Sequence, residues 1–384
     1  MMDYPGLGAS GDDLSLHAVI LHDRGAPVKH STIVPAGVML VAVIAGACGT
    51  DLPSEATPPQ VATASAAAYT SVDIGALLGN YSSKANGVND AGDVAGWSCC
   101  GSGSGAFARV AGVVRLLAGD GSAALAISNG APRYVVGYSG SPSKPVRWTI
   151  GNPTQATFLS LLADERSGAA LGVNDAGAAV GSAGARAAMW SAAGTRTSLP
   201  APAGFTRGEG RGINNADHAV FVFFVAGSDW NGARAYLRLA SGSLVALPPQ
   251  SGDVASYAND ISEVVDGAVY IAGTTRTSQD VFRSVRWKVN VATGVILQTT
   301  LRSEMSHALA VGNAGGTVGY LEENVRSLRY IAYLWRGTEF LTLNPPKGGK
   351  DGRAFAASPN GRFVAGETVV ALTPHAVLWT IGSP

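Results

Sequence analysis

The pattern of apolar and polar positions in residues 170–190, ALGVNDAGAAVGSAGARAAMW, predicts three short β-strands. The first two strands flank an Asn-Asp-x-Gly stretch, the second contains Gly181, and the third ends at Trp190. Asn and Asp side chains hydrogen-bond to their own backbone in tight turns, and Gly readily adopts a positive φ there. We therefore expect a strand, a hairpin turn, a strand, a loop and a third strand.

The same unit recurs along the rest of the chain. There are seven copies, and their opening stretches are residues 84–98, 124–139, 170–190, 210–224, 256–274, 308–320 and 354–367. A third strand follows each copy. In five copies it ends in tryptophan, whereas AFARV at 106–110 and AYLRL at 235–239 take its place in the other two. Units of about 40 to 50 residues with four short strands have the size of one propeller blade.

Six of the second strands carry a glycine, which weakens a strand unless something packs closely on the bare backbone. These are Gly96, Gly137, Gly181, Gly273, Gly319 and Gly366. We expect the bulky aromatic residue of the neighbouring strand to cover each glycine.

A fourth strand is predicted after most third strands, at 113–117, 157–162, 243–248, 294–301 and 339–343, with only a poor one at 195–200. The last copy has none, but an unassigned strand lies upstream at residues 68–77. Pairing of that strand with the last unit would remove free sheet edges. The predicted fold is thus all-β, a seven-bladed β-propeller of four-stranded antiparallel blades over residues 68–384, closed by an N-terminal strand.

The units resemble the HAF-type extracellular repeat. The resemblance is carried by GVNDAGDVAGWS at 87–98, GVNDAGAAVGS at 172–182, HAVLW at 375–379 and VDIG at 72–75. It implies a secreted or surface-exposed repeat protein and no defined activity. The turn SPNGRFVAG at 358–366 is also similar to turns of periplasmic TolB-like propellers.

The N-terminal 47 residues predict a leader and signal peptide. A basic pair at 29–30, an apolar run at 33–47 and Cys48 resemble a bacterial lipoprotein signal, with Cys48 as the lipidated residue. An ordinary secretory signal is the alternative, and the run is too short for a membrane anchor. The acidic residues 1–27 fit a signal poorly, so translation is expected to start near Val28. Residues 48–67 predict a flexible tether.

The amino-acid composition restricts the classes of binding partner. Lys plus Arg and Asp plus Glu are 27 each, a net charge of zero. A zero balance argues against nucleic acid and against a polybasic membrane face, which need excess positive charge. We expect a monomer in the bacterial cell envelope, anchored by its lipid or else secreted, on the periplasmic side or at the surface.

Few residues indicate catalysis or metal binding. The Asn-Asp turns could be read as calcium loops, but no copy supplies the distal bidentate Glu, so hairpin turns are favoured. Cys99 and Cys100 either form a vicinal disulfide or stay as thiols. No nucleophile-elbow, zincin or P-loop motif occurs. We expect no metal, no cofactor and no catalytic residue.

Loops of variable length on a repeated scaffold usually mark its binding face. The second-to-third-strand loops and the connections between units vary here and carry charge. The candidate ligand-binding residues are Arg207, Arg211, Asp229, Trp230, Arg276, Glu322, Glu323 and Lys347.

The predicted function is a binding or scaffold module for a protein, peptide or glycan. The alternatives are a carbohydrate-active enzyme, either a lyase or a hydrolase, and a passive surface protein. An enzyme should place an acidic group beside His or Arg at the channel mouth, where the unit starts offer Arg211, His307 and Arg353.

Overall fold

The computed structural model describes residues 69–75, 81–101, 104–151, 153–227, 232–323 and 329–382, all of which belong to the compact unit Ala62–Pro384. The predicted leader, Cys48 and tether lie outside the described residues. Regular structure within the described residues is β-strand alone. The described part of the chain holds no helix with the length and apolar character needed to cross a membrane.

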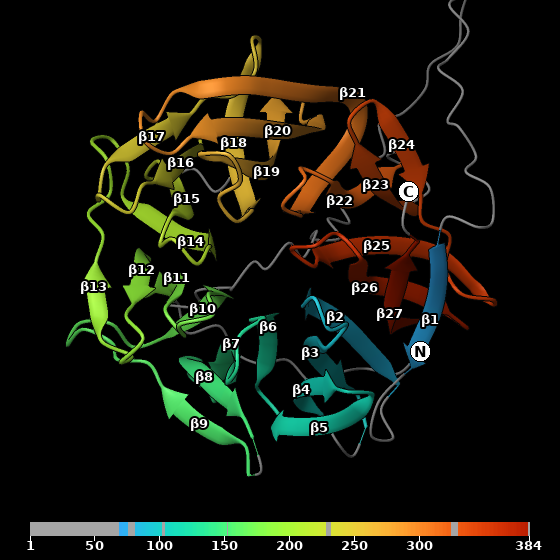
Figure 1. The fold of residues 1–384 in the computed structure, drawn as a ribbon. Helices are drawn as coiled ribbons and strands as arrows, with labels where there is room; N and C mark the ends of the chain where they lie inside the picture. Colours follow the sequence, from blue (N-terminus) through green and yellow to red (C-terminus); the bar gives the residue numbers. More distant parts are fainter. Residues whose placement is uncertain are drawn as a thin grey trace, which may run out of the picture. The chain divides into compact units, whose positions relative to one another are not determined.

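The strands form antiparallel sheets that follow one another in chain order around a common centre (Figure 1). The first two sheets comprise β2 (Ser82–Val88), β3 (Val94–Cys99), β4 (Gly105–Val110) and β5 (Val113–Ala118), then β6 (Ala123–Ile127), β7 (Arg133–Ser139), β8 (Lys144–Ile150) and β9 (Gln155–Phe158). The next two comprise β10 (Gly168–Val173), β11 (Ala179–Ala183), β12 (Arg186–Trp190) and β13 (Arg196–Ser198), then β14 (Arg207–Ile213), β15 (Ala219–Phe224), β16 (Arg234–Arg238) and β17 (Leu244–Leu247).

The following sheet has seven strands, because one long strand serves two units. It comprises β18 (Asp253–Ile261), β19 (Ala268–Thr277), β20 (Phe282–Asn290), β21 (Ile296–Val311), β22 (Thr317–Glu322), β23 (Tyr330–Arg336) and β24 (Glu339–Thr342). The first part of β21 pairs with β20 and its last part pairs with β22. Separate strands at 294–301 and from 308 were expected. That prediction was wrong, since residues 302–307, RSEMSH, contain no Gly, Pro or Asn to break the extended backbone.

The last sheet combines the two ends of the described chain. It comprises β1 (Tyr69–Gly75), β27 (Thr373–Ile381), β26 (Phe363–Val370) and β25 (Gly349–Ala357), in that spatial order. Thr70 pairs with Thr380 and Val72 with Leu378. The predicted partnership of the upstream strand with the HAVLW strand is therefore confirmed.

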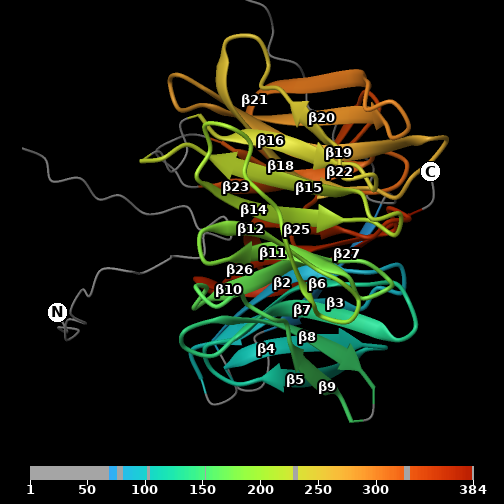
Figure 2. The same ribbon diagram turned by 90° about the vertical axis from the view of Figure 1, so that its left-hand side faces the viewer.

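The sheets pack face to face through apolar side chains. The view in Figure 2, turned by 90°, shows the strands of neighbouring sheets stacked one over another. Trp148, Trp190, Trp287 and Trp379 are each 0 or 1% exposed, as expected for core residues. Strands of a propeller bury both faces against neighbouring sheets, so their apolar runs need not alternate with polar residues.

The strand glycines are required chiefly by the backbone of the first strand. A Cβ on Gly181 would lie 2.0 Å from the carbonyl oxygen of Ala169, and a Cβ on Gly319 would lie 1.7 Å from that of His307. The expected aromatic cover is present at Gly96, where the ring of Phe107 lies 2.9 Å from the Cβ position, and at Gly273, beneath Trp287. At Gly137 and Gly181 the three nearest atoms are all backbone, so the aromatic explanation was incomplete.

In each unit a turn joins the first strand to the second, and hydrogen bonds link these turns from one unit to the next. We call the linked turns the turn series. The backbone N–H of Asp90 donates to Asn129 Oδ1 at 2.7 Å, and the N–H of Asn129 donates to Asp175 Oδ1 at 2.7 Å. Asp175 donates likewise to Asn215, Asn215 to Glu263, and Glu263 to Asn313.

The turn series continues until it returns to its first residue. Asn313 N–H donates to the carbonyl oxygen of Pro359 at 2.7 Å, and Asn360 N–H donates to Asp90 Oδ1 at 2.9 Å. The Asn and Asp of the repeat therefore do more than close their own hairpins, because they also link each unit to the next.

Serine hydroxyls make a second set of links between sheets. Ser122 Oγ accepts from Ala106 N–H at 2.8 Å, Ser256 Oγ accepts from Ala235 N–H at 3.1 Å, and Ser306 Oγ accepts from Ser284 N–H at 3.0 Å between the two units of the seven-stranded sheet. Ser83 Oγ accepts from Ala376 N–H at 2.8 Å, which ties the first sheet to the last. An apolar cluster that includes Phe107 and Leu378 fills the space between those two sheets.

Candidate functional site

The first strands of the units share one register, and β2, β6, β10, β14 and β25 among them lie near the common centre in Figure 1. In each, a small residue pairs with the glycine of the second strand, or with Phe221 in the fourth sheet. We call the residue directly before this small residue the inner position. The inner positions are Lys84, Ala123, Ala169, Glu209, Tyr257, His307 and Arg353.

The inner positions break the repetition. The second and third sheets have alanine there, whereas β18, β21, β25 and β2 carry Tyr257, His307, Arg353 and Lys84. Repeats of one unit need only a small residue at such a place, so chemically distinct side chains on successive strands indicate a requirement beyond folding. We call the residues around them, Lys84, His307, Tyr320, Glu322, Tyr330, Arg353 and Glu367, the inner-strand cluster.

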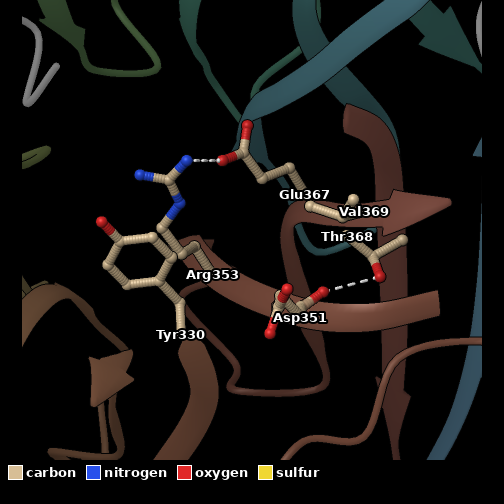
Figure 3. Close-up of a pocket in the computed structure, with 7 residues that line it drawn as sticks. Tyr330, Asp351, Arg353, Glu367, Thr368 and Val369 are labelled. Atoms are coloured by element: carbon tan, nitrogen blue, oxygen red, sulfur yellow. Dashed lines mark hydrogen bonds and ion pairs between the residues drawn. The ribbon is translucent and has the colours of Figure 1, made fainter. Parts of the chain in front are cut away.

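Arg353 is the centre of one half of the inner-strand cluster. Its Nη2 forms an ion pair with Oε1 of Glu367, and its guanidinium carbon lies 4.5 Å from the centroid of the Tyr330 ring (Figure 3). Lys84 Nζ lies 4.0 Å from the centroid of Phe355. Burial lowers the pKa of Lys84, Glu367 opposes this effect, and Arg353 adds to it.

His307 is the centre of the other half. Its Nε2 is 3.1 Å from Oε1 of Glu322, and its ring lies between Phe282, at 4.9 Å, and Tyr320, at 4.7 Å between centroids. Tyr320 connects the two halves, since its ring also meets Tyr330 edge-on at 5.3 Å.

The two tyrosines are held neutral. Burial raises the pKa of Tyr320 and, to a smaller extent, that of Tyr330, and the nearby Glu322 adds to both shifts. The hydroxyl of Tyr320 is fully buried and has no hydrogen-bond partner among the described residues. Such an unsatisfied buried group is uncommon in folded proteins, and each one calls for an explanation.

A cavity of about 90 Å³ adjoins the inner-strand cluster. It lies between β23, β25 and β26 (Figure 3). Three residues belong both to its lining and to the inner-strand cluster: Tyr330, Arg353 and Glu367. Its other lining residues are Asp351, Gly352, Thr368 and Val369.

The structure brings two of the predicted ligand-binding residues to this region. Glu322 belongs to the inner-strand cluster, and Arg276 reaches its edge, with its guanidinium carbon 5.6 Å from the ring of Phe282 and its Nη2 2.5 Å from Asp280. Glu323 lies just beyond and binds Arg329 at 3.0 Å.

The other predicted residues are elsewhere or outside the described part. Arg211 pairs with Glu209 on its own strand, Arg207 lies 5.8 Å from the ring of Phe224, and Lys347 is exposed in the turn before β25. Asp229 and Trp230 lie outside the described residues.

Four residues of the inner-strand cluster were not predicted from the sequence: Lys84, Tyr320, Tyr330 and Glu367. The predicted site residues were charged residues of loops, whereas these four belong to strands. A signal was present, because aligning the copies on their first alanine puts unlike residues at the preceding position. His307 and Arg353, named from the sequence only as groups that an enzyme could use, occupy that position.

The remaining chemical predictions concern cysteines and metals. Cys99 and Cys100 are joined as a vicinal disulfide at the end of β3. Among the described residues, no group of three or more His, Cys, Asp or Glu side chains is arranged to hold a metal ion. Asn89, Asn174 and Asn214 accept backbone N–H groups of their own turns through Oδ1, in agreement with hairpin turns.

The chain matches no protein-family model and no curated protein sequence. Its fold is similar to that of solved structures. Virginiamycin B lyase from Staphylococcus aureus aligns with a TM-score of 0.50 and 11% identity, over 82% of this chain and 100% of that one. A chain of the mitotic checkpoint complex aligns with a TM-score of 0.51 and 12% identity, over 89% and 100%.

A third similar structure, TolB from Acinetobacter baumannii, has a TM-score of 0.40 and 11% identity, over 72% of this chain and 59% of that one. At such low identities the likeness concerns the fold alone. The two higher-scoring likenesses, together with the four-stranded antiparallel sheets, establish an all-β, propeller-like fold.

Proposed function

We propose that this protein is a lipid-anchored, extracytoplasmic binding module built as a seven-bladed β-propeller. Seven blades follow if β21 is counted once with β20 and once with β22. Closure is supported by the β1–β27 pairing, by the bond from Asn360 to Asp90 and by the bond from Ala376 to Ser83.

The lipid-anchored, extracytoplasmic location is a proposal from residues 29–48 alone, in which Cys48 carries the lipid. Replacing Cys48 by serine should move the protein from the membrane fraction to the soluble envelope fraction and abolish labelling by a fatty-acid analogue. Unchanged labelling of Cys48→Ser would contradict the lipoprotein assignment.

The observation that carries the binding function is the break in repetition at the inner positions. Four successive first strands around the last sheets and the first sheet hold an aromatic, a histidine and two cations, while the second and third sheets hold alanine. A purely passive surface protein has no need for this asymmetry. The ligand classes are a protein, a peptide or a glycan, held at the end of the sheets opposite the turn series.

Photo-crosslinking tests this location in cells. A benzoylphenylalanine at Tyr330, inside the inner-strand cluster, should give a crosslinked adduct. The same group at Ala176, an exposed residue of the turn series end, should give no such adduct. Equal adducts at both positions, or none at Tyr330, would argue against a ligand at the inner-strand cluster.

A carbohydrate-active enzyme is the second candidate, favoured by the pair of His307 and Glu322 at 3.1 Å. A carboxylate that orients an imidazole is a recurring arrangement for general acid–base catalysis. Incubation with polysaccharides should then release new reducing or unsaturated ends, and His307→Gln should abolish that release. His375→Gln is the matched control. His375, on β27, also lies 3.1 Å from a carboxylate, that of Asp73, but it does not belong to the inner-strand cluster. Equal activity of His307→Gln and the wild type would exclude this role.

A further inference from the structure

The cavity beside the inner-strand cluster has hydrogen-bonding capacity that the described residues do not use. Arg353 pairs with Glu367 through one nitrogen, and its other N–H groups have no hydrogen-bond partner among the described residues. The side chain of Asp351 is 28% exposed, and its Oδ1 lies 3.7 Å from Nε of Arg329, its ion-pair partner among the described residues. The cavity therefore offers donors from one side chain and acceptors from another.

Charges of both signs surround the cavity, two cations and three carboxylates. Arg353 is matched by Glu367, and Arg329 is matched by Glu323 and Asp351. An anionic ligand group would meet Asp351 and Glu367, and a cationic one would meet Arg353, so either would face a like charge at short range. A neutral group that both donates and accepts hydrogen bonds meets no such opposition.

Hydroxyl groups have this double capacity, since each is one donor and two acceptors. A cavity needs about 10–15 Å³ of water-accessible space to hold one water, so about 90 Å³ has room for several hydroxyl groups. That is enough for the hydroxyl-bearing edge of one sugar ring. Tyr330 supplies an apolar wall with a polar tip, which suits the mixed surface of a sugar.

We propose that this cavity is a subsite for a neutral sugar residue of a glycan, which rests on the proposed binding function and selects one of its ligand classes. One hydroxyl donates to the carboxylate of Asp351, and a neighbouring hydroxyl accepts from the guanidinium of Arg353. Glu367 holds that guanidinium in place, and the ring edge lies against Tyr330.

The test uses the full chain and an array of neutral, acidic and amino oligosaccharides, followed by calorimetry on the best-bound neutral one. Asp351→Ala should weaken that binding by roughly tenfold to a hundredfold, as expected for hydrogen bonds to a charged group. Lys350→Ala is the matched control, because Lys350 is the exposed neighbour on β25 and does not line the cavity. It should change the affinity by less than about twofold.

Salt gives an independent readout. Binding of a neutral sugar should change by less than about twofold between low and high ionic strength, whereas binding of an ion should weaken strongly.

Three results would overturn the subsite. These are preference for acidic or amino oligosaccharides, binding of a neutral one that Asp351→Ala leaves unchanged, and binding of peptides from a parallel library with no sugar bound. Each of the three leaves the binding module intact. Failure of every sugar and peptide, together with no adduct from the crosslinker at Tyr330, would instead defeat the proposed function itself.

Discussion

Replacing Asp175 by alanine tests whether the turn series holds the sheets together. Asp175 Oδ1 accepts the backbone N–H groups of Asn129 and Gly130, both at 2.7 Å, and its Oδ2 accepts Nδ2 of Asn215 at 2.9 Å. The residue thus joins the second, third and fourth sheets. Its deletion leaves three donors without their charged acceptor.

The size of the effect follows from these three bonds. A hydrogen bond to a charged group contributes about 1.5–3 kcal/mol when it is buried. The bonds of Asp175 are partly exposed, and water can replace part of them, so we expect a loss on the order of 3 kcal/mol. At about 2 °C per kcal/mol for a domain of this size, Tm should fall by about 6 °C.

Two further variants make the test specific. Asp175→Asn keeps Oδ1 as an acceptor for both backbone N–H groups but turns an amide toward Nδ2 of Asn215, so its loss should be smaller, about 1 kcal/mol. Asp120→Ala removes an exposed carboxylate that forms no hydrogen bond or ion pair with the described residues and should change stability by less than about 0.5 kcal/mol. Urea unfolding followed by tryptophan fluorescence measures all three. If Asp175→Ala were no less stable than Asp120→Ala, the turn series would not contribute to stability.

Three other predictions concern the described residues. Burial raises the pKa of Asp260 to about 7, against an ordinary value of 3.8, so the folded state binds the extra proton and wild-type stability should fall as pH rises from about 4 to 7. Asp260→Asn should remove this fall and gain on the order of 2 kcal/mol over the wild type at pH 8, and parallel stability–pH curves would contradict it. Gly181→Ala should cost more than about 3 kcal/mol, because its Cβ would meet the carbonyl oxygen of Ala169 at 2.0 Å, whereas Gly119→Ala, with nothing within 4 Å, should be nearly neutral in thermal melts. Lys84 is a buried cation, whose desolvation offsets its favourable interactions, so Lys84→Met should leave Tm within about 2 °C. Glu367→Ala should lower Tm clearly more, because it leaves Arg353 without its ion-pair partner.

Most strands could be predicted because short sequence signals within each repeat mark where they begin and end. Asn-Asp-x-Gly turns and strand glycines mark the first two strands of a unit, and seven approximate copies confirm one another. The links of the turn series join residues 39 to 50 positions apart, and the closing link from Asn360 to Asp90 joins residues 270 positions apart, so no local pattern can reveal them. The continuity of β21 was missed for a related reason, since repeat alignment assumes a boundary where the extended backbone has none.

The candidate site was harder to predict. Loop charge pointed to Glu322 and to Arg276 at the edge of the inner-strand cluster, but also to Arg207 and Lys347, which the structure does not bring to it. Charged residues in loops are common on any soluble surface. Departure from the repeat inside a strand is the better guide, because a residue such as His307 replaces an alanine that the fold alone would accept.

The most direct measurement of the central claim is a disulfide between the two ends of the described chain. Thr70 on β1 and Thr380 on β27 are register partners, and directly opposed residues on antiparallel strands lie about 4.5–5.5 Å apart, within disulfide range. In the chain carrying Thr70→Cys and Thr380→Cys, mild oxidation should form this bond, detected by mass spectrometry, without loss of fold. The pair Thr70→Cys and Thr149→Cys, with Thr149 on β8, should not crosslink. Absence of the first bond, or equal formation of both, would contradict a ring that β1 completes.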